Sequence, residues 1–277
     1  MLDRIRARSA QAIATGALEP IATTSVAIDD GGIRFRVHCM SNLKRKLASK
    51  QTGRPANPLL NYDSDLFVES LTDTHLCLLN KFPVYENHVL IVTAQFEEQQ
   101  APLSIRDFEA LCICLRNVDG LAFYNAGPAA GASQTHRHLQ LVPLSGQQIP
   151  MEAAFTRAVE SGARHAALPF RHRLARLNFE QGAAEAHQAL SVYLDLLSET
   201  GLIADPAELP ERTPPYNLLC TRRWMMVCPR SREVSGSISI NALGFAGTLL
   251  VSDPAELAEV KARGPMALLK EVAVESS

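Results

Sequence analysis

The sequence has few aromatic residues, almost no net charge and no long apolar run. Aromatic residues make up 6% of its 277 residues, and the formal net charge is -2. Proteins that bind nucleic acid broadly are usually strongly basic, so this charge argues against a nucleic acid as partner. No uncharged apolar stretch reaches the roughly 20 residues of a membrane-spanning helix. We therefore expect neither nucleic acid nor a membrane among its partners.

Cysteine spacing excludes two kinds of site. None of the six cysteines forms the C-x-x-C pair of a zinc knuckle or a thioredoxin-type centre. Most of them lie in apolar runs, where a thiol packs as a small hydrophobic group. The N-terminal segment 1–6 has charges but no apolar stretch after them, unlike a secretory signal. We expect reduced thiols, no disulfides and a cytoplasmic protein.

Apolar periodicity predicts a mixture of helices and strands, in a chain long enough for one large domain or two ordinary ones. The composition becomes rich in alanine after Pro150, so we divide the chain into residues 1–150 and 151–277. Helices are predicted at residues 1–18, from Ser104 to about 115, at 151–167 and 181–202, from 252 to 264 and up to about 272. Strands are predicted at 33–37, 76–79, 88–92, 121–124, from 136, at 216–219 and at 224–227, with a loop at 53–65 and a connector at 205–215.

The most informative motif is His136-Arg137-His138-Leu139-Gln140. Side chains of a strand alternate between its two faces, so two imidazoles and a carboxamide would line one surface. The preceding segment 127–134 consists mostly of small residues, whose backbone can approach an anion closely. The combination favours chemistry on a phosphate.

A neutral imidazole can attack phosphorus and form a phosphoramidate, provided that one ring nitrogen is free and a hydrogen bond fixes the other. A backbone carbonyl or His136 could supply that bond. The non-bridging phosphate oxygens also need donors, and the backbone N–H groups of 131–134, the Ser133 hydroxyl and the Gln140 amide are candidates. Lys46, in a basic cluster, is the candidate to hold a leaving polyphosphate.

Other interpretations of these residues stay open. A His-x-His pair can bind a metal or be purely structural, although Gln140, in the third position, is a poor zinc ligand. His88 begins an apolar strand and is expected to orient the site from behind. Asn80, at the end of the preceding strand, is equally suited to contact a ribose or to cap a turn. Residues 76–92 resemble 216–227, and we hypothesise a degenerate internal duplication.

Several segments together resemble one branch of the histidine-triad superfamily, the ATP adenylyltransferases or diadenosine tetraphosphate phosphorylases. In that branch a glutamine replaces the last histidine of the triad, as Gln140 does here. The segments are Leu78–Phe82 with His88, Leu121–Gly127, Gly131–Gln140, Tyr216–Met225 and Gly244–Leu249. The resemblance extends from about residue 35 to residue 272.

The resemblance implies an α+β fold, in which helices flank a histidine-triad-like antiparallel sheet. An internal duplication would relate this fold to the hexose-1-phosphate uridylyltransferases. Residues 1–150 would be the catalytic half, with residues 151–277 packed on the same sheet. The implied reaction converts diadenosine tetraphosphate and phosphate into ATP and ADP through an adenylyl-histidine. No tightly bound cofactor is expected, and Mg²⁺ could accompany the nucleotide.

The resemblance also implies roles for individual residues. His138 would be the nucleophile, His136 would support it, and Gln140 would contact the transferred phosphate. The substrate-binding residues would be Gly131, Ser133 and Gln134 in a phosphate-binding turn, Asn125 as a site asparagine, Asn80 as a ribose contact and Lys46 as a polyphosphate ligand.

Three alternatives have weaker support. Hexose-1-phosphate uridylyltransferases typically have proline between the two histidines and zinc-type cysteine pairs, whereas this chain has Arg137 and no such pairs. A histidine-triad nucleotide hydrolase is disfavoured by Gln140 and by the second half of the chain. A non-catalytic nucleotide sensor is disfavoured because His136, His138 and Gln140 are all present.

Overall fold

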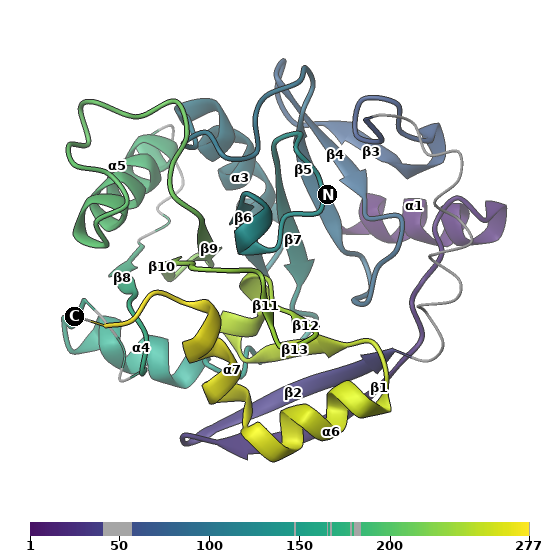
Figure 1. Ribbon diagram of the computed structural model, residues 1–277. Helices are drawn as coiled ribbons and strands as arrows, with labels where there is room; N and C mark the ends of the chain where they lie inside the picture. Colours follow the sequence, from purple (N-terminus) through teal and green to yellow (C-terminus); the bar gives the residue numbers. More distant parts are fainter. Residues whose placement is uncertain are drawn as a thin grey trace.

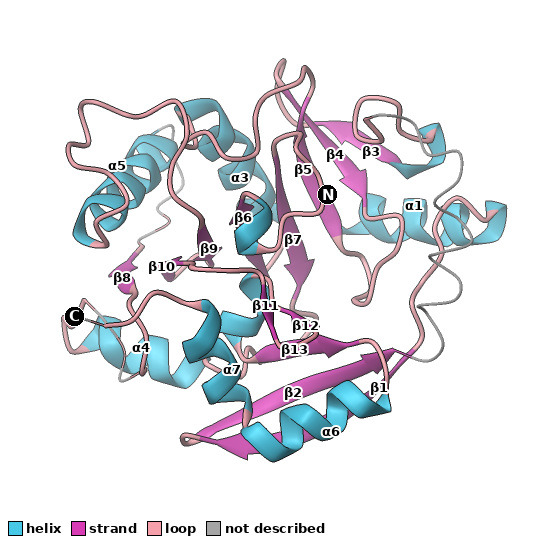
Figure 2. Ribbon diagram, in the orientation of Figure 1, coloured by secondary structure: helices cyan, strands magenta, loops and turns pink. Residues whose placement is uncertain are grey.

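One antiparallel sheet of eight strands dominates the computed structural model, which describes residues 1–40, 57–146, 148–164, 166, 168–177, 179 and 184–276 (Figure 1, Figure 2). The strand order is β3-β4-β5-β7-β6-β9-β10-β8. These strands are β3 Phe67–Ser70, β4 His75–Leu79, β5 Val89–Thr93, β6 Gly120–Ala126, β7 His138–Pro143, β8 Arg173–Arg176, β9 Tyr216–Cys220 and β10 Trp224–Pro229. The sheet therefore passes from the N-terminal half of the chain to the C-terminal half between β6 and β9.

A smaller sheet, in the order β1-β2-β13, combines the two ends of the chain. β1 (Thr23–Asp30) and β2 (Ile33–Met40) form a hairpin, and β13 (Thr248–Val251) pairs with β2 in parallel. Helix α6 lies against this sheet in the lower part of Figure 1. The remaining C-terminal elements are β11 Val234–Ser235, β12 Ile238–Ser239, α6 Pro254–Arg263 and α7 Pro265–Val272.

Two apolar cores lie on opposite faces of the large sheet. Helices α1 (Leu2–Thr15), α3 (Ile105–Asn117) and α5 (Ala184–Glu199) cover one face. On the other face, α4 (Glu152–Glu160), the 3-10 turn η3 (Ala242–Ala246) and the small sheet pack around the buried Trp224 and Phe245. This second core includes residues of β6 and β7 but none of β4 or β5, and polar side chains at the end of those two strands face a cavity instead.

Most of the predicted elements are confirmed, and the strands that the sequence missed are all edge strands. α1 ends at Gly16 in the left-handed region, with a φ of 78°, and α3 begins after Ser104 as predicted. α4 and α5 are shorter than the helices predicted at 151–167 and 181–202. The strands that were not predicted are β1, β3, β8, β11, β12 and β13. β11 and β12 pair only with each other, and each of the other four forms the edge of its sheet. A half-exposed edge strand lacks the apolar pattern of a strand buried on both faces.

The six cysteines are buried free thiols, as predicted. No helix within the described ranges is both long and apolar enough to cross a membrane. Part of the predicted loop at 53–65 lies outside the described residues, and its end contains a short 3-10 turn, η1 (Ser64–Leu66).

The sheet order supports an internal duplication, but between units different from those that the sequence suggested. Reading outward from the β6–β9 pair gives β6-β7-β5 on one side and β9-β10-β8 on the other. Along the chain, both groups follow the same order of a strand, a helix and two paired strands. The first is β5, α3, β6 and β7, and the second is β8, α5, β9 and β10. β9–β10 therefore corresponds to β6–β7, and the matching of 216–227 with 76–92 is wrong. Asn125 and Asn217 pair with each other at the centre of this arrangement.

A buried ionic network attaches α3 to the large sheet. Arg137, between the two histidines of the motif, donates to Asp107 at 3.2 Å and to Glu97 at 2.6 Å. Asp107 Oδ2, which accepts from Arg137, also accepts the Ser104 N–H at 2.7 Å. Asp107 Oδ1 lies 3.2 Å from His75 Nε2. Burial opposes ionisation of Asp107, but the His75 hydrogen bond and the Arg137 charge lower its pKa overall.

Replacing Asp107 with Asn should lower the free energy of unfolding at neutral pH by about 3 kcal/mol, because the buried Arg137 charge loses a partner. The folded-state pKa of Asp107 lies below the unfolded value of about 4, so its stabilisation is present above that pH and is lost as the pH falls through the folded value. Urea unfolding should therefore show a deficit that shrinks in acid. Asp3→Asn, at a carboxylate whose side chain is 98% exposed, is the control and should leave the midpoint unchanged. Equal stability of Asp107→Asn and the parent at neutral pH would contradict this account.

Candidate active site

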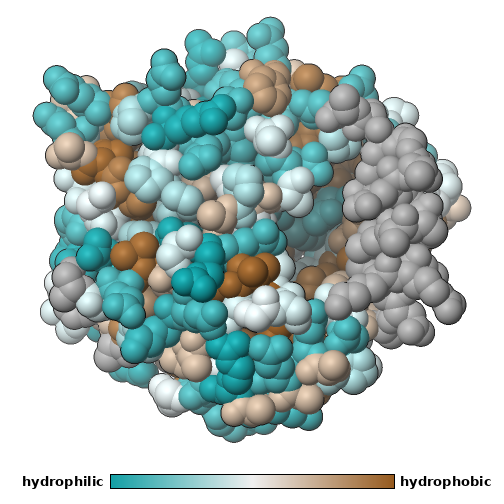
Figure 3. Space-filling view, in the orientation of Figure 1, coloured by the Kyte–Doolittle hydropathy of each residue, from teal (hydrophilic) through white to brown (hydrophobic). Residues whose placement is uncertain are grey.

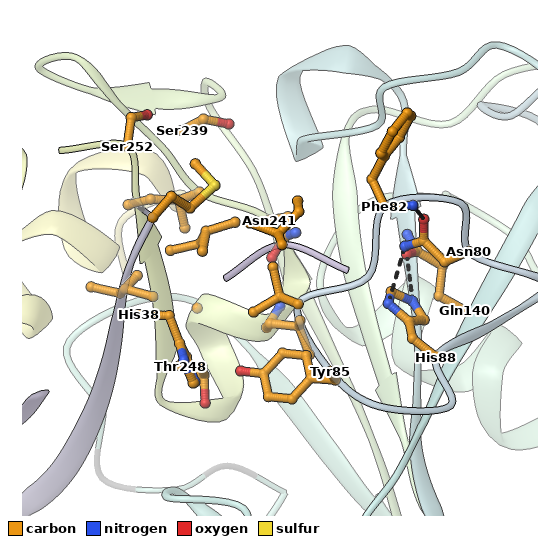
Figure 4. Close-up of a pocket in the computed structure, with 18 of the residues that line it drawn as sticks. His38, Asn80, Phe82, Tyr85, His88, Gln140, Ser239, Asn241, Thr248 and Ser252 are labelled. Carbon is orange, nitrogen blue, oxygen red and sulfur yellow. Dashed lines mark hydrogen bonds between the residues drawn. The ribbon is translucent and has the colours of Figure 1, made fainter. Parts of the chain in front are cut away.

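A cavity of about 280 Å³ lies between the large and the small sheet. Residues of the β4–β5 turn and β7 line one side, and residues of β2, β13 and the segment before β13 line the other (Figure 4). Tyr85, from the β4–β5 turn, and Thr248, on β13, both line the cavity. In the space-filling view, which has the orientation of Figure 1, the surface is hollowed near the middle, where polar and apolar residues meet (Figure 3). A ligand in the cavity would contact both halves of the chain.

Three polar side chains on the sheet side of the cavity form a directed chain of hydrogen bonds (Figure 4). Asn80 Oδ1 accepts the Phe82 N–H at 3.1 Å, which turns the Asn80 Nδ2 group toward His88 Nδ1, also at 3.1 Å. His88 Nδ1 is then an acceptor, so the ring proton lies on Nε2 and is donated to Gln140 Oε1 at 3.0 Å. Burial lowers the pKa of His88 to about 4, which keeps this neutral form. The amide N–H groups of Gln140 donate to no described residue and can face a ligand.

These contacts decide between some of the earlier interpretations. His88 orients Gln140, in agreement with its predicted position behind the site. Asn80 caps the turn before Phe82, while its predicted ribose contact stays a prediction. Both Asn80 and Gln140 line the cavity.

His138, the first residue of β7, has a defined tautomer. Its Nδ1 donates to the backbone carbonyl of His136 at 2.8 Å, so of the two partners considered from sequence, the carbonyl forms the bond. Burial lowers the pKa of His138 to about 4, and the ring is neutral at physiological pH. Nε2 therefore has a lone pair, and no described residue forms a hydrogen bond with it. This is the state that a nucleophilic imidazole requires.

The ring of His136 does not continue the row that the motif predicted. β7 begins at His138, and His136 forms only an isolated bridge with Glu98. Its Nε2 lies 2.9 Å from the carbonyl oxygen of Thr93 and 3.1 Å from that of Gln95. The prediction of three side chains on one strand is wrong for His136, because these carbonyls hold its ring beside the end of β5.

The small-residue turn after β6 is the 3-10 turn η2 (Pro128–Ala130), with glycines in the left-handed region on both sides. Gly131 has a φ of 87°, and a Cβ atom there would come within 2.9 Å of Asn241 Cβ. Its N–H already donates to the Pro128 carbonyl at 2.8 Å, so the structure shows a conformational contribution, and the predicted contact of Gly131 with substrate stays a prediction. The N–H groups of Ser133 and Gln134 donate to no described residue, and both stay predicted phosphate ligands.

The C-terminal half supports this turn through buried polar side chains. Asn125 Oδ1 accepts from Asn217 Nδ2 at 2.8 Å and from the Ala242 N–H at 3.0 Å. Asn217 also donates to the Ala130 carbonyl at 2.9 Å. Arg230, which is 3% exposed, donates to the same carbonyl at 3.3 Å and to Asn217 Oδ1 at 2.5 Å. Asn125 thus joins the two halves, and its predicted contact with substrate stays a prediction.

Sequence reasoning did not identify Asn217 and Arg230 as part of the site. The repeated Tyr-Asn pair at 124–125 and 216–217 is the signal that could have indicated Asn217. Lys46, predicted to hold polyphosphate, lies outside the described residues. Within the described ranges, no three His, Cys, Asp or Glu side chains are grouped so that they could hold a metal ion.

Comparisons with known proteins match nearly the whole chain. The family model of the Ap4A phosphorylase N-terminal domain matches residues 1–157, and that of the ATP adenylyltransferase C-terminal domain matches residues 166–275. Diadenosine 5',5'''-P1,P4-tetraphosphate phosphorylase 2 of Saccharomyces cerevisiae is 29% identical over 242 residues, which cover 78% of this chain and 74% of the yeast protein.

Solved structures show the same fold. The crystal structure of yeast Ap4A phosphorylase Apa2 superposes with a TM-score of 0.80 at 25% identity, and covers 99% of this chain and 97% of that chain. Its complex with AMP gives the same TM-score, identity and coverage. The chain therefore belongs to the Ap4A phosphorylase family of ATP adenylyltransferases.

Proposed function

We propose that this protein cleaves diadenosine tetraphosphate with phosphate, and releases ATP and ADP. His138 Nε2 attacks the phosphorus next to one adenosine, a P–N bond forms, and the P–O bond to the leaving ATP breaks. An oxygen of inorganic phosphate then attacks the adenylyl group, the P–N bond breaks, and ADP leaves. The proposal rests above all on the hydrogen bond from His138 Nδ1 to the His136 carbonyl, because it fixes the lone pair on Nε2.

The remaining groups would bind the substrate around that step. The amide of Gln140, oriented by His88, would donate to a non-bridging oxygen of the transferred phosphate. The N–H groups of Ser133 and Gln134 would add further donors. Asn80 would contact the ribose, Asn125 the bound nucleotide, and Lys46 the leaving polyphosphate. Each of these groups is uncharged except Lys46, so binding of the departing ATP would depend mainly on the lysine.

The proposed steps use no tightly bound cofactor, and Mg²⁺ would enter with the nucleotide. The protein is proposed to work in the cytoplasm, where six buried free thiols stay reduced. A histidine-triad hydrolase would share the first step and differ only in the acceptor, since water would release AMP. Product analysis therefore separates the two functions directly.

His138→Ala should abolish formation of ATP and ADP, with a loss on the order of 10⁴-fold, because the covalent step has no other nucleophile. Incubation of the parent with diadenosine tetraphosphate, without phosphate, should yield an adenylylated peptide containing His138 by mass spectrometry. His187→Ala, at an exposed histidine of α5, is the matched control and should keep full activity. Tight nucleotide binding with no label on His138 would instead indicate a nucleotide sensor.

The rate of adenylylation should not change with pH from about 8 down to about 5.5. At the lower end of this range an ordinary histidine, with a pKa near 6.5, would be protonated, but His138 would still be neutral. The buried His138 has a pKa of about 4, so the neutral nucleophile is lost only as the pH approaches that value. The measurement is the single-turnover rate without phosphate, since the internal phosphates of the dinucleotide do not titrate in this range. A rate that halves near pH 6.5 would show that His138 is not buried as described.

Gln140→His should increase hydrolysis, measured as AMP, by about tenfold or more relative to ADP. The reason is that an imidazole can act as a base for water, whereas the neutral amide cannot, so water would compete with phosphate for the adenylyl group. Products are separated by ion-exchange chromatography at fixed phosphate concentration. An unchanged AMP fraction would count against a role for Gln140 in the choice of acceptor.

A further inference from the structure

We infer that Gln99 is a positioning residue, whose carboxamide holds β6 and β7 apart beside His138 and so keeps the phosphate-binding turn open. The inference rests on the proposed role of His138 as nucleophile. It concerns a side chain that is 2% exposed and belongs to neither the His-x-His-x-Gln motif nor the turn.

The pairing of β6 with β7 stops two positions before His138. Regular pairs run from Gly120 and Pro143 to Phe123 and Gln140. Continuing the same register would place Asn125 opposite His138, but these two residues do not pair directly. The side chain of Gln99 bridges them instead.

The contacts of Gln99 replace the missing ladder bonds. Its Oε1 accepts the His138 N–H at 2.8 Å, and its Nε2 donates to the Asn125 carbonyl at 3.0 Å and to the His138 carbonyl at 3.2 Å. One carboxamide therefore forms hydrogen bonds with both the N–H and the C=O of His138. Without Gln99, these two buried groups would be unpaired or would pair directly with β6.

The second half of the chain shows what happens without such an insertion. Asn217, the counterpart of Asn125, pairs directly with Cys228, which occupies the place of His138. The β9–β10 ladder continues from there to Cys220 and Met225, and residues 221–223 close the hairpin. In the first half, residues 127–137 leave the sheet as an open turn instead. The side chain of Gln99, inserted between Asn125 and His138, distinguishes the β6–β7 pair from the β9–β10 pair.

The backbone of Gln99 is itself fixed to both sides of the opening. Its N–H donates to the Thr135 carbonyl at 2.8 Å, and its carbonyl accepts the Tyr124 hydroxyl. Tyr124 belongs to β6, and Thr135 is near the end of the turn. Gln99 thus connects β6, the turn and β7, and a change at its side chain should move the backbone of His138.

Gln99→Met should slow adenylylation by about 100-fold with little change in nucleotide affinity. Methionine has a similar length but cannot form the hydrogen bonds of the carboxamide, and a nucleophile displaced by about 1 Å loses about 100-fold in rate.

Gln99→Glu should be slow at alkaline pH and recover as the pH falls toward about 6. Ionised, the buried carboxylate faces two carbonyl oxygens and cannot donate, and its pKa is raised; protonated, it can donate again. Simple destabilisation would not produce this pH profile.

The experiment measures the single-turnover adenylylation rate with diadenosine tetraphosphate, without phosphate, between pH 6 and 8.5. Rates are normalised to the folded fraction, which the single tryptophan, Trp224, reports by fluorescence. Thr200→Val is the control, because Thr200 is 3% exposed and its hydroxyl bonds to the Leu196 and Leu197 carbonyls in α5 and not to the residues that Gln99 contacts. It should lose stability but keep the parent rate.

A parent-like rate for folded Gln99→Met, or a pH-independent rate for Gln99→Glu, would overturn the inference. If Gln99→Met does not fold, the pH profile of Gln99→Glu alone decides. His138→Ala separates this result from the proposed function. Activity without His138 refutes the covalent mechanism, whereas an inactive His138→Ala together with an unimpaired Gln99→Met refutes only the role of Gln99.

Discussion

The pairing of β6 with β9 is the contact on which the site depends. At its centre, Asn125 and Asn217 lie side by side, and their buried side chains must find hydrogen-bond partners. The two side chains bond to each other. Asn217 also donates to the Ala130 carbonyl in η2, and Asn125 accepts the Ala242 N–H of η3. Arg230 adds its buried guanidinium to the same carbonyl of the turn. The position of the small-residue turn after β6, the proposed phosphate-binding turn, is therefore fixed from the C-terminal half, although every residue of the turn comes from the N-terminal half.

Burial has the same effect on two histidines, and their partners give them different functions. The pKa of His88 and that of His138 are both lowered to about 4, so both rings are neutral donors and acceptors. His88 has partners at both nitrogens and transmits an orientation to Gln140. His138 has a carbonyl at Nδ1 and no described partner at Nε2. The proposed nucleophile, His138, is thus distinguished from His88 by an unused lone pair and not by its ionisation.

Local sequence features predicted the elements that local physics decides. Ser104 and the apolar stripe after it indicated the start of α3, and the strands at the centre of the large sheet had continuous apolar runs. The strands β1, β3, β8, β11, β12 and β13 were missed because each pairs with a single neighbour and is partly exposed, so it lacks the continuous apolar run of a central strand. The row of three site residues was predicted from strand alternation, and it fails at His136 because the strand starts two residues later.

The sequence by itself determined the family and the antiparallel α+β fold, and it singled out His138 and Gln140 as the proposed reacting residues, because two neighbours on one strand face need only a spacing of two. Only the tertiary structure decided which nitrogen of His138 is free, which residue orients Gln140, and which side chains hold the turn open. The last two answers depend on His88, Gln99 and Arg230, which approach the motif and the turn from other elements. A hydrogen bond requires a distance and a direction in space, and a single sequence specifies neither between residues that are far apart along the chain.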